Sequence, residues 1–382
     1  MLTRPCWINI DLDQYIKNIN IVKNGITEGT ILMDVLKDNA YGCGAVPLAK
    51  IAWDEGITNF AVSNVPEALE LREALPEADI LVLGYTTLDM LKIGVQKNIG
   101  FSIWNLQMAK QLEKLGKEYE KRVKIHFILD TGLSRLGFLP TEKSLDDMKV
   151  ISQMKHIKIQ GIFSHFARTE TEDDEFSMGQ IEEFSEFVES MKKKNIATGI
   201  VHISDSAAIV KFRNADLDLV RCGALLIGSM TGKHIVKDDN NFNTKSILSL
   251  HSRIARVAEF PAGRSVSYDI TYVSDHPIKV ATIPVGYGDG IPSQLSGNMK
   301  VLISGKRCKQ VGAVNMDMLM VDASDVSCKE GDEVVLLGTQ GDNEITLDDW
   351  SAWGGKSSTF FLSMLRNRIP HFYLKNGKVI KL

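Results

Sequence analysis

Eight short apolar runs, separated by helix-patterned segments, constrain the fold of this chain more than any other feature. The runs are residues 31–37, 59–63, 80–85, 100–104, 123–130, 157–165, 199–204 and 217–223. Between the sixth and seventh runs, apolar residues recur at helical spacing at Met178, Ile181, Phe184, Phe187 and Met191. Eight strands separated by helices over roughly 200 residues predict an α/β fold of the (β/α)8 TIM-barrel type. An open doubly wound sheet is the alternative, and the lack of a glycine-rich dinucleotide loop disfavours it.

The pattern changes beyond residue 241. Residues 237–241 form a polar stretch typical of a linker. After it, short alternating strands are expected over residues 265–273, 279–285, 300–303, 318–321 and 333–337. We therefore expect a barrel over residues 8–233 and a mostly β C-terminal domain over residues 234–382. The opening strand, residues 7–11, could join either domain, and residues 1–7 could join the second.

Bulk composition narrows the class of protein. The chain has 382 residues and a net charge of −4, so neither nucleic acid nor an anionic membrane is an expected partner. Its five cysteines are scattered and odd in number, which indicates neither a disulfide framework nor a zinc site. The first residues lack the apolar core of a signal peptide, and no apolar stretch approaches about 20 residues. A cytoplasmic location is expected.

A lysine stands at the carboxyl end of the first run. Lys37 is followed by Asp-Asn-Ala-Tyr-Gly-Cys-Gly, a short loop that contains Tyr41 and two glycines. Partial desolvation at the end of a buried strand lowers the pKa of a lysine amine from about 10.4, which suits the amine to Schiff-base chemistry. A single strand-end lysine is more often merely solvated, so Lys37 needs support from other residues.

Further polar and glycine residues follow the ends of the other predicted strands. They are Arg135, His165, Ser206, Arg221 and Gly223. Because barrel enzymes hold their chemistry at the carboxyl ends of the strands, we expect these residues and Lys37 at one rim, where they could bind an anionic cofactor. Taken singly, the arginines could be structural ion-pair partners and Ser206 a helix cap. His165 could be a core histidine, and for His202 we prefer that interpretation.

Three segments of the second domain complete the pattern. Ser265-Val266-Ser267-Tyr268 comes first, Ile-Pro-Val-Gly-Tyr-Gly-Asp-Gly follows at residues 283–290, and Val314-Asn315-Met316-Asp317 comes last. With the lysine motif, which resembles the common form Lys-x-Asn/Asp-Ala-Tyr-Gly-His-Gly, they stand in the order and near the spacing of the alanine racemase family. The chain thus resembles these pyridoxal-phosphate enzymes over almost its whole length.

The resemblance implies an isomerase that depends on pyridoxal 5'-phosphate (PLP). It would interconvert L- and D-alanine by two bases, as a homodimer with shared active sites that supplies D-alanine for peptidoglycan. Lys37 would carry the cofactor and act as one base, and Tyr268 of the partner subunit would be the other. The other cofactor-binding positions would be Tyr41, Arg135, His165, Ser206, Arg221, Gly223, Ala224 and Asn367. The substrate-binding positions would be Arg135, Tyr287, Met316 and Asp317.

Arg221 has a particular role in that resemblance. It would face the pyridine nitrogen and leave it unprotonated, because an arginine side chain only donates hydrogen bonds. Delocalisation of a carbanion into the ring would then be limited, and proton transfer would depend on two well-placed bases. His165 would hold Arg221 in place.

Several positions depart from the usual family pattern. They are Cys43, Ile128, Asp269, Ser293, Asn315 and Asn367. Ile128 stands where many members carry a carbamylated lysine that orients the arginine, so Arg135 would need another anionic partner. Asn367 stands where tyrosine is usual, which would enlarge the pocket and add an amide able to bind a side-chain hydroxyl. A serine or broader-specificity racemase is therefore the alternative to an alanine racemase.

Other classes match the sequence less well. Related PLP decarboxylases carry a Cys-Glu-Ser motif and a Gly-Glu-Pro-Gly motif, and neither occurs in this sequence. A non-catalytic PLP carrier resembles the barrel half alone, and Tyr268 with its domain argues against it. A metal-dependent hydrolase would need clustered His and Asp ligands at the strand ends, which the sequence does not place there.

Overall fold

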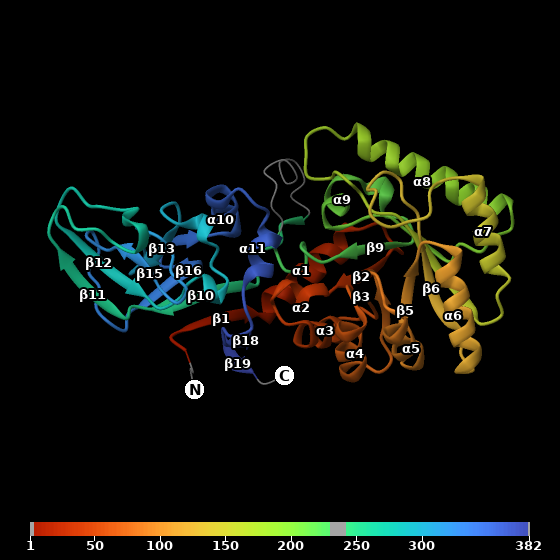
Figure 1. Ribbon diagram of the computed structural model, residues 1–382, viewed down its shortest axis with the longest axis horizontal. Helices are drawn as coiled ribbons and strands as arrows, with labels where there is room; N and C mark the ends of the chain where they lie inside the picture. The colour runs from red at the N-terminus through yellow and green to blue at the C-terminus, as the bar shows by residue number, and fades with distance from the viewer. Residues whose placement is uncertain (1–3, 230–241, 381–382) are drawn as a thin grey trace.

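The computed structural model describes residues 4–229 and 242–380. It is elongated, with an α/β barrel at one end and a β-rich domain at the other (Figure 1). The predicted linker at residues 237–241 and the predicted boundary between residues 233 and 234 lie outside the described residues.

Eight parallel strands form the barrel, in the hydrogen-bonded order β8-β7-β6-β5-β4-β3-β2-β9. Their bounds are β2 Ile31–Val35, β3 Asn59–Val62, β4 Asp79–Val82, β5 Gly100–Ile103, β6 Val123–Ile128, β7 Ile157–Phe163, β8 Ile200–His202 and β9 Leu219–Cys222. Between β8 and β9, at the two ends of this order, single backbone hydrogen bonds close the barrel. One runs from Arg221 N to Ser204 O, just after β8, at 3.1 Å. The prediction of a (β/α)8 barrel is confirmed. Every strand ends before the last residue predicted for it, because the final residues leave the ladder and form the rim.

Helices cover the outer face of the barrel (Figure 1). Their bounds are α1 Leu12–Gly25, α3 Ala45–Asp54, α4 Val65–Ala74, α5 Leu88–Gln96, α6 Leu106–Glu118, α7 Glu142–Ser152, α8 Glu175–Lys193 and α9 Ser206–Lys211. The short element α2 Lys37–Tyr41 is a left-handed turn at the carboxyl end of β2. Several begin at a side chain that accepts from the backbone of the first turn, as Asn64, Asn105 and Asp205 do. The predicted apolar stripe lies on α8, where Phe184 is buried but Met178 is exposed.

The second domain is built on two sheets. One has the order β14-β13-β16-β10-β1-β18-β19, with β17 paired to β16, and the other has the order β11-β12-β15. The strands are β1 Cys6–Asp11, β10 Leu248–Arg253, β11 Arg256–Phe260, β12 Ile278–Ile283, β13 Lys300–Ile303, β14 Lys306–Lys309, β15 Leu319–Asp322, β16 Glu333–Gln340, β17 Asn343–Ile345, β18 His371–Lys375 and β19 Lys378–Ile380. Two helices, α10 Leu347–Gly354 and α11 Ser358–Met364, lie on the side toward the barrel (Figure 1).

The first strand belongs to this second domain. Ile8 of β1 pairs with Leu250 of antiparallel β10 and with His371 of parallel β18. Residues 8–11 were expected in the barrel range, and the structure places them in the C-terminal sheet instead. The reason is that β1 fills the gap between β10 and β18, which would otherwise both be edge strands.

The strand predicted over residues 265–273 is wrong. The segment turns at Ser267, Asp269 and Ile270, whose φ angles are 70°, 58° and 51°. These left-handed conformations are incompatible with an extended strand. Its two ends, Ser265 and Val273, instead face each other in an isolated antiparallel bridge.

Side chains fill the interior of the barrel. Met33, Val35, Ala61, Leu81, Ile128, Phe163 and Leu219 form an apolar cluster there. A ligand can therefore bind only above this layer, at the rim where the strands end.

Candidate active site

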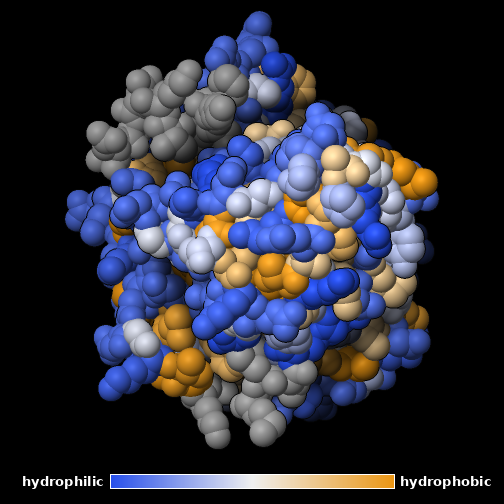
Figure 2. Space-filling view, turned by 90° about the vertical axis from the view of Figure 1, so that its left-hand side faces the viewer, coloured by the Kyte–Doolittle hydropathy of each residue, from blue (hydrophilic) through white to orange (hydrophobic). Residues whose placement is uncertain are grey.

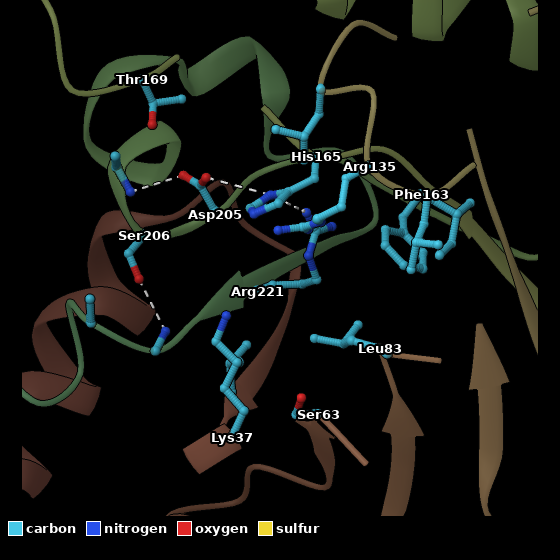
Figure 3. A pocket seen from close by; sticks show the side chains of 18 of the residues that line it. Lys37, Ser63, Leu83, Arg135, Phe163, His165, Thr169, Asp205, Ser206 and Arg221 are labelled. Atoms are coloured by element: carbon cyan, nitrogen blue, oxygen red, sulfur yellow. Dashed lines mark hydrogen bonds and ion pairs between the residues drawn. The ribbon is translucent and has the colours of Figure 1, made fainter. Parts of the chain in front are cut away.

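A cavity of about 500 Å³ opens at the carboxyl ends of the barrel strands. Eight of the residues predicted from the sequence line it: Lys37, Tyr41, Arg135, His165, Ser206, Arg221, Gly223 and Ala224. Figure 3 shows several of them converging from different elements, with Lys37 below Arg221 and Ser206 to one side. The structure thus brings together the whole predicted rim set.

Lys37 enters the cavity from an unusual turn. The four residues after it, from Asp38 to Tyr41, all have φ between 52° and 54°. Such left-handed conformations cost roughly 1–2 kcal/mol for each residue with a β-carbon, and strain of this kind concentrates at functional sites. Asn39 helps to hold the turn, since its side-chain oxygen accepts a hydrogen bond from Ala45 N at 2.8 Å. Residue 37 is thereby fixed between a strand and a rigid loop.

The environment of Lys37 favours its neutral amine. Burial lowers the pKa of the amine, and the nearby cations Arg135 and Arg221 lower it further, while Asp205 and Glu67 oppose the shift. A neutral amine is the form that can act as a nucleophile or accept a proton. The burial and charge around Lys37 therefore support the Schiff-base and proton-transfer chemistry expected for this lysine.

Ser206, Tyr41 and Gly223 meet at one end of the cavity. The Ser206 hydroxyl oxygen accepts from Gly223 N at 3.0 Å and from Leu225 N at 3.2 Å. Among the described residues, the acceptor for its own proton is the Cys222 Sγ, 4.0 Å away. A β-carbon on Gly223 would lie 2.6 Å from the Tyr41 hydroxyl. Two hydroxyl donors beside a backbone without side-chain bulk fit a phosphate group.

Arg221 is buried and held by three strong acceptors. Its NH1 lies 2.9 Å from His202 Nδ1, and its NH2 donates to the carbonyl oxygens of Ser164 at 2.9 Å and Ile203 at 2.8 Å. His165 Nδ1 lies farther away, 3.4 Å from NH2. The Nε–H bonds no described residue, so the guanidinium lines the cavity with a donor to spare. A donor there fits an unprotonated ring nitrogen.

The partner of Arg221 was assigned differently from the sequence. We expected His202 to be a core histidine and His165 to hold Arg221. His202 is indeed buried, but its ring bridges Arg221 and a second buried histidine, His126, whose Nδ1 lies 3.0 Å from His202 Nε2. Because arginine only donates, His202 Nδ1 must accept and His202 Nε2 must carry the proton. Burial lowers the pKa of His126 to about 4 and that of His202 as well, so both rings are neutral at pH 7.

Arg135 makes no hydrogen bond or ion pair with any residue of the described ranges. Ile128, which replaces the usual lysine, is buried in the apolar cluster of the barrel and supplies no anion. Three carboxylates that we did not predict, Asp130, Glu170 and Asp205, line the same cavity. Burial and Asp205 together raise the pKa of Glu170. Asp205 had a signal in the sequence, since it stands directly before Ser206 at a strand end.

The remaining predicted residues do not line this cavity. Tyr268, Tyr287, Met316, Asp317 and Asn367 belong to the second domain, and the first three are 67%, 44% and 54% exposed. Tyr287 N donates to Asn315 O at 2.9 Å, which joins the Tyr287 and Met316 loops. Figure 2 shows hydrophobic atoms gathered between hydrophilic ones at this end of the molecule.

Arg368 ties the Asp317 loop to the turn that carries Asn367. Its guanidinium donates to Asp289 at 2.7 Å and to Asp317 at 2.6 Å. Asp289 is fully buried and also accepts from Gly286 N at 3.0 Å. The loops of Tyr287, Asp317 and Asn367 therefore form one connected unit.

Two further properties concern residues 4–229 and 242–380. No group of three or more His, Cys, Asp or Glu side chains in these ranges is placed to hold a metal ion. No helix within them has the length and apolar character needed to cross a membrane.

Comparison with known proteins gives consistent results. Residues 10–231 match the family model "Alanine racemase, N-terminal domain", and residues 247–373 match "Alanine racemase, C-terminal domain". The chain is 34% identical over 380 residues to alanine racemase 1 of Clostridium acetobutylicum, covering 99% of this chain and 98% of that protein. It is 34% identical over 381 residues to the alanine racemase of Clostridium novyi, with the same coverage.

Solved structures resemble the whole chain. The alanine racemase of Clostridium difficile 630 superposes with a TM-score of 0.94 at 29% identity, covering 100% of this chain and 98% of that one. The alanine racemase of Bacillus anthracis with bound L-Ala-P gives a TM-score of 0.93 at 29% identity, with the same coverage. Both domains are thus matched in one superposition.

Proposed function

The chain belongs to the alanine racemase family, and from that premise we propose that its rim cavity binds PLP and that Lys37 and Tyr268 are its two bases. The family membership makes the chain an isomerase that interconverts L- and D-alanine. The observation that carries the cofactor proposal is the convergence of Lys37, Arg221 and the Ser206–Gly223 corner on one cavity.

The residues of the cavity fit the parts of the cofactor. When bound, PLP withdraws electrons from the substrate amine and so acidifies the neighbouring Cα–H bond. Tyr41, Ser206, Gly223 and Ala224 would hold its phosphate, and Arg221 would donate to its ring nitrogen. Burial lowers the pKa of Arg221 only to about 10, so the guanidinium stays charged at neutral pH and has no proton acceptor to offer.

Inversion at Cα needs a proton to leave from one face and another to arrive on the opposite face. Lys37, whose neutral amine is favoured, would serve one face. Tyr268 is 67% exposed and does not line the cavity of its own chain. We therefore propose a homodimer in which Tyr268 of the partner subunit completes the site, with the Met316–Asp317 loop receiving the substrate carboxylate.

The exposed side chains around Tyr268 support this dimer. Ile270, Tyr287 and Met318 are 69%, 44% and 44% exposed. Large apolar residues that are exposed in one subunit are typical of a protein interface. A cytoplasmic location and a role in supplying D-alanine for peptidoglycan follow from the family resemblance and stay predictions.

Serine racemisation is a second candidate. Asn367 offers an amide where a tyrosine is usual in the family, and it is exposed next to Arg368 in the unit that carries Tyr287 and Asp317. An amide can bind the hydroxyl of serine, which alanine lacks.

The test is a time course with L-alanine and with L-serine, followed by chiral chromatography, with PLP binding followed by visible absorbance. Wild-type protein should form D-alanine. Tyr268→Phe should keep the absorbance change but lose at least about 100-fold in racemisation rate, because one base is gone. Faster turnover of serine would favour the second candidate, and no turnover of either would refute the racemase assignment for both substrates.

Subunit mixing tests the shared site. Lys37→Ala and Tyr268→Phe homodimers should each be inactive, but a mixed dimer would contain one complete site. Dissociation and random reassociation should restore about a quarter of wild-type activity, because half of the dimers are mixed and each has one of two sites intact. No recovery, with mixed dimers shown to form, would place both bases in one subunit.

A further inference from the structure

His165 has two charged neighbours at one nitrogen. Its Nδ1 lies 3.4 Å from Arg221 NH2, which can only donate, and 3.6 Å from Asp205 Oδ2, which can only accept (Figure 3). The other ring nitrogen, Nε2, bonds no residue of the described ranges, and the ring lines the cavity. The position of the proton on His165 therefore decides what Nε2 offers to a ligand.

Both hydrogens of Arg221 NH2, the nitrogen nearest His165, are already used. NH2 carries two hydrogens, and the carbonyl oxygens of Ser164 and Ile203 accept from it at 2.9 and 2.8 Å. The contact with His165 is the longest of the three and would need a third hydrogen. Arg221 therefore has no free NH2 hydrogen to donate to His165 Nδ1, and this nitrogen does not need to stay unprotonated as an acceptor for Arg221.

One carboxylate oxygen of Asp205 is free to accept a hydrogen bond from His165. Its Oδ1 caps α9, accepting from Ala207 N at 3.1 Å and from Ala208 N at 3.0 Å. Its Oδ2 contacts no donor other than His165 among the described residues. A proton on His165 Nδ1 could be donated to this oxygen as a hydrogen bond. Hydrogen bonds in an active site are often long without a ligand and shorten when the ligand binds.

We propose that Asp205 is a positioning residue that holds His165 in the Nδ1–H tautomer, so that Nε2 faces the cavity as an acceptor. The acceptor suits a hydroxyl or ammonium group that enters the site. The inference rests on the proposed function for its catalytic consequence, because the group entering the cavity would be part of the racemisation reaction. One carboxylate then has two tasks, since the same side chain orients α9 and with it Ser206.

The charges around this pair keep His165 neutral, which makes the tautomer a real choice. Burial lowers the pKa of His165, the cations Arg221, Arg135 and Lys37 lower it further, and Asp205 opposes them. Asp205 also raises the pKa of Glu170, a second carboxyl group that lines the cavity. A neutral imidazole has a single ring proton, so it is a donor at one nitrogen and an acceptor at the other.

Asp205→Asn separates the two tasks of the carboxylate. Asparagine caps a helix as well as aspartate does, so α9 should stay in place. Its amide nitrogen would face His165 Nδ1 as a donor and would force the proton to Nε2. Asp11→Asn is the matched control, because Asp11 caps α1 by accepting from Gln14 N at 2.9 Å and has no histidine beside it.

The experiment is ¹⁵N NMR of PLP-loaded protein labelled at its eight histidines, with the His165 signals assigned by their loss in His165→Gln. Wild type and Asp11→Asn should show His165 protonated at Nδ1, and Asp205→Asn should show it protonated at Nε2. The pH dependence of kcat/KM for L-alanine is the second readout. Asp205→Asn should lose at least about tenfold, as wrongly oriented histidines do, and the protonation midpoint of His165 should move to lower pH.

Three results would overturn the proposal. They are an Nε2–H tautomer in wild type, an unchanged tautomer in Asp205→Asn, and a changed tautomer with kcat/KM and its pH profile unaffected. Absence of racemisation in wild type would refute the proposed function, whereas the NMR tautomer would still decide the role of Asp205.

Discussion

Asp34 is a buried acid on the strand that leads to Lys37, and its ionisation should limit stability at neutral pH. The side chain is 1% exposed on β2, and its Oδ2 accepts from the Tyr15 hydroxyl at 2.5 Å. Burial raises the pKa of Asp34 from 3.8 to about 7, although the hydrogen bond from Tyr15 opposes the rise. The perturbation we choose is Asp34→Asn, which keeps an acceptor for Tyr15 and removes the charge.

The size of the effect follows from this pKa difference. The native state binds the Asp34 proton more tightly than the unfolded chain does. The stability that comes from this tighter binding is therefore complete below about pH 4 and is lost as the pH rises through 7. Between pH 5 and pH 8 the loss covers about 2 pKa units, or about 3 kcal/mol at 1.36 kcal/mol per unit. The variant does not ionise and should not lose it.

The assay is urea unfolding of both proteins at pH 5 and pH 8, followed by circular dichroism. The free energy of unfolding of Asp34→Asn, minus that of wild type, should rise by about 3 kcal/mol between the two pH values. Any packing cost of the amide is the same at both values and cancels. Asp11→Asn, at an exposed helix cap, should show no such rise. A difference that stays constant within about 0.5 kcal/mol would refute the reasoning, because Asp34 would then ionise as it does in the unfolded chain.

Three further predictions concern the site. Gly223→Ala places a β-carbon 2.6 Å from the Tyr41 hydroxyl, so the Tyr41 ring must move. PLP should then bind about 5- to 30-fold more weakly in a fluorescence titration, and an unchanged affinity would exclude this corner as the phosphate site. His202→Ala removes the acceptor 2.9 Å from Arg221 NH1 and should lower the free energy of unfolding by about 1.5–3 kcal/mol. No loss would mean that the carbonyl oxygens of Ser164 and Ile203 are sufficient to hold the buried Arg221. Asn367→Tyr should raise the ratio of kcat/KM for alanine over serine, measured by chiral chromatography, and an unchanged ratio would rule out Asn367 as a selector.

Local patterns were sufficient for much of the fold and for half of the site. The eight strands could be predicted because each is a short apolar run bounded by polar residues. Lys37, Ser206 and Arg221 could be placed together because parallel strands all end at one rim. These inferences need only the order of residues and the geometry of a barrel.

The rest depended on information that a residue pattern does not contain. The alternation of Tyr268 and Ile270 is compatible with a strand, but their segment turns through positive φ angles. The roles of His202 and Asp205 emerge only when donors and acceptors are counted in space, since His202 contacts Arg221 and Asp205 contacts His165 across the rim. The proposed meeting of Tyr268 with Lys37 involves a second subunit, which the pattern of one chain does not describe.

The pairing of β1 has a consequence for how the chain is made. β1 leaves the ribosome first, but its partners β10 and β18 begin at Leu248 and His371. At 5–20 residues per second, synthesis of the roughly 240 residues from β1 to β10 takes on the order of 10–50 s, during which an apolar strand has no sheet to join. The barrel, whose strands lie between β1 and β10, can close in that time. We therefore expect a fragment that ends after β9 to carry β1 as an unpaired segment prone to self-association, and removal of residues 1–11 to make such a fragment more soluble.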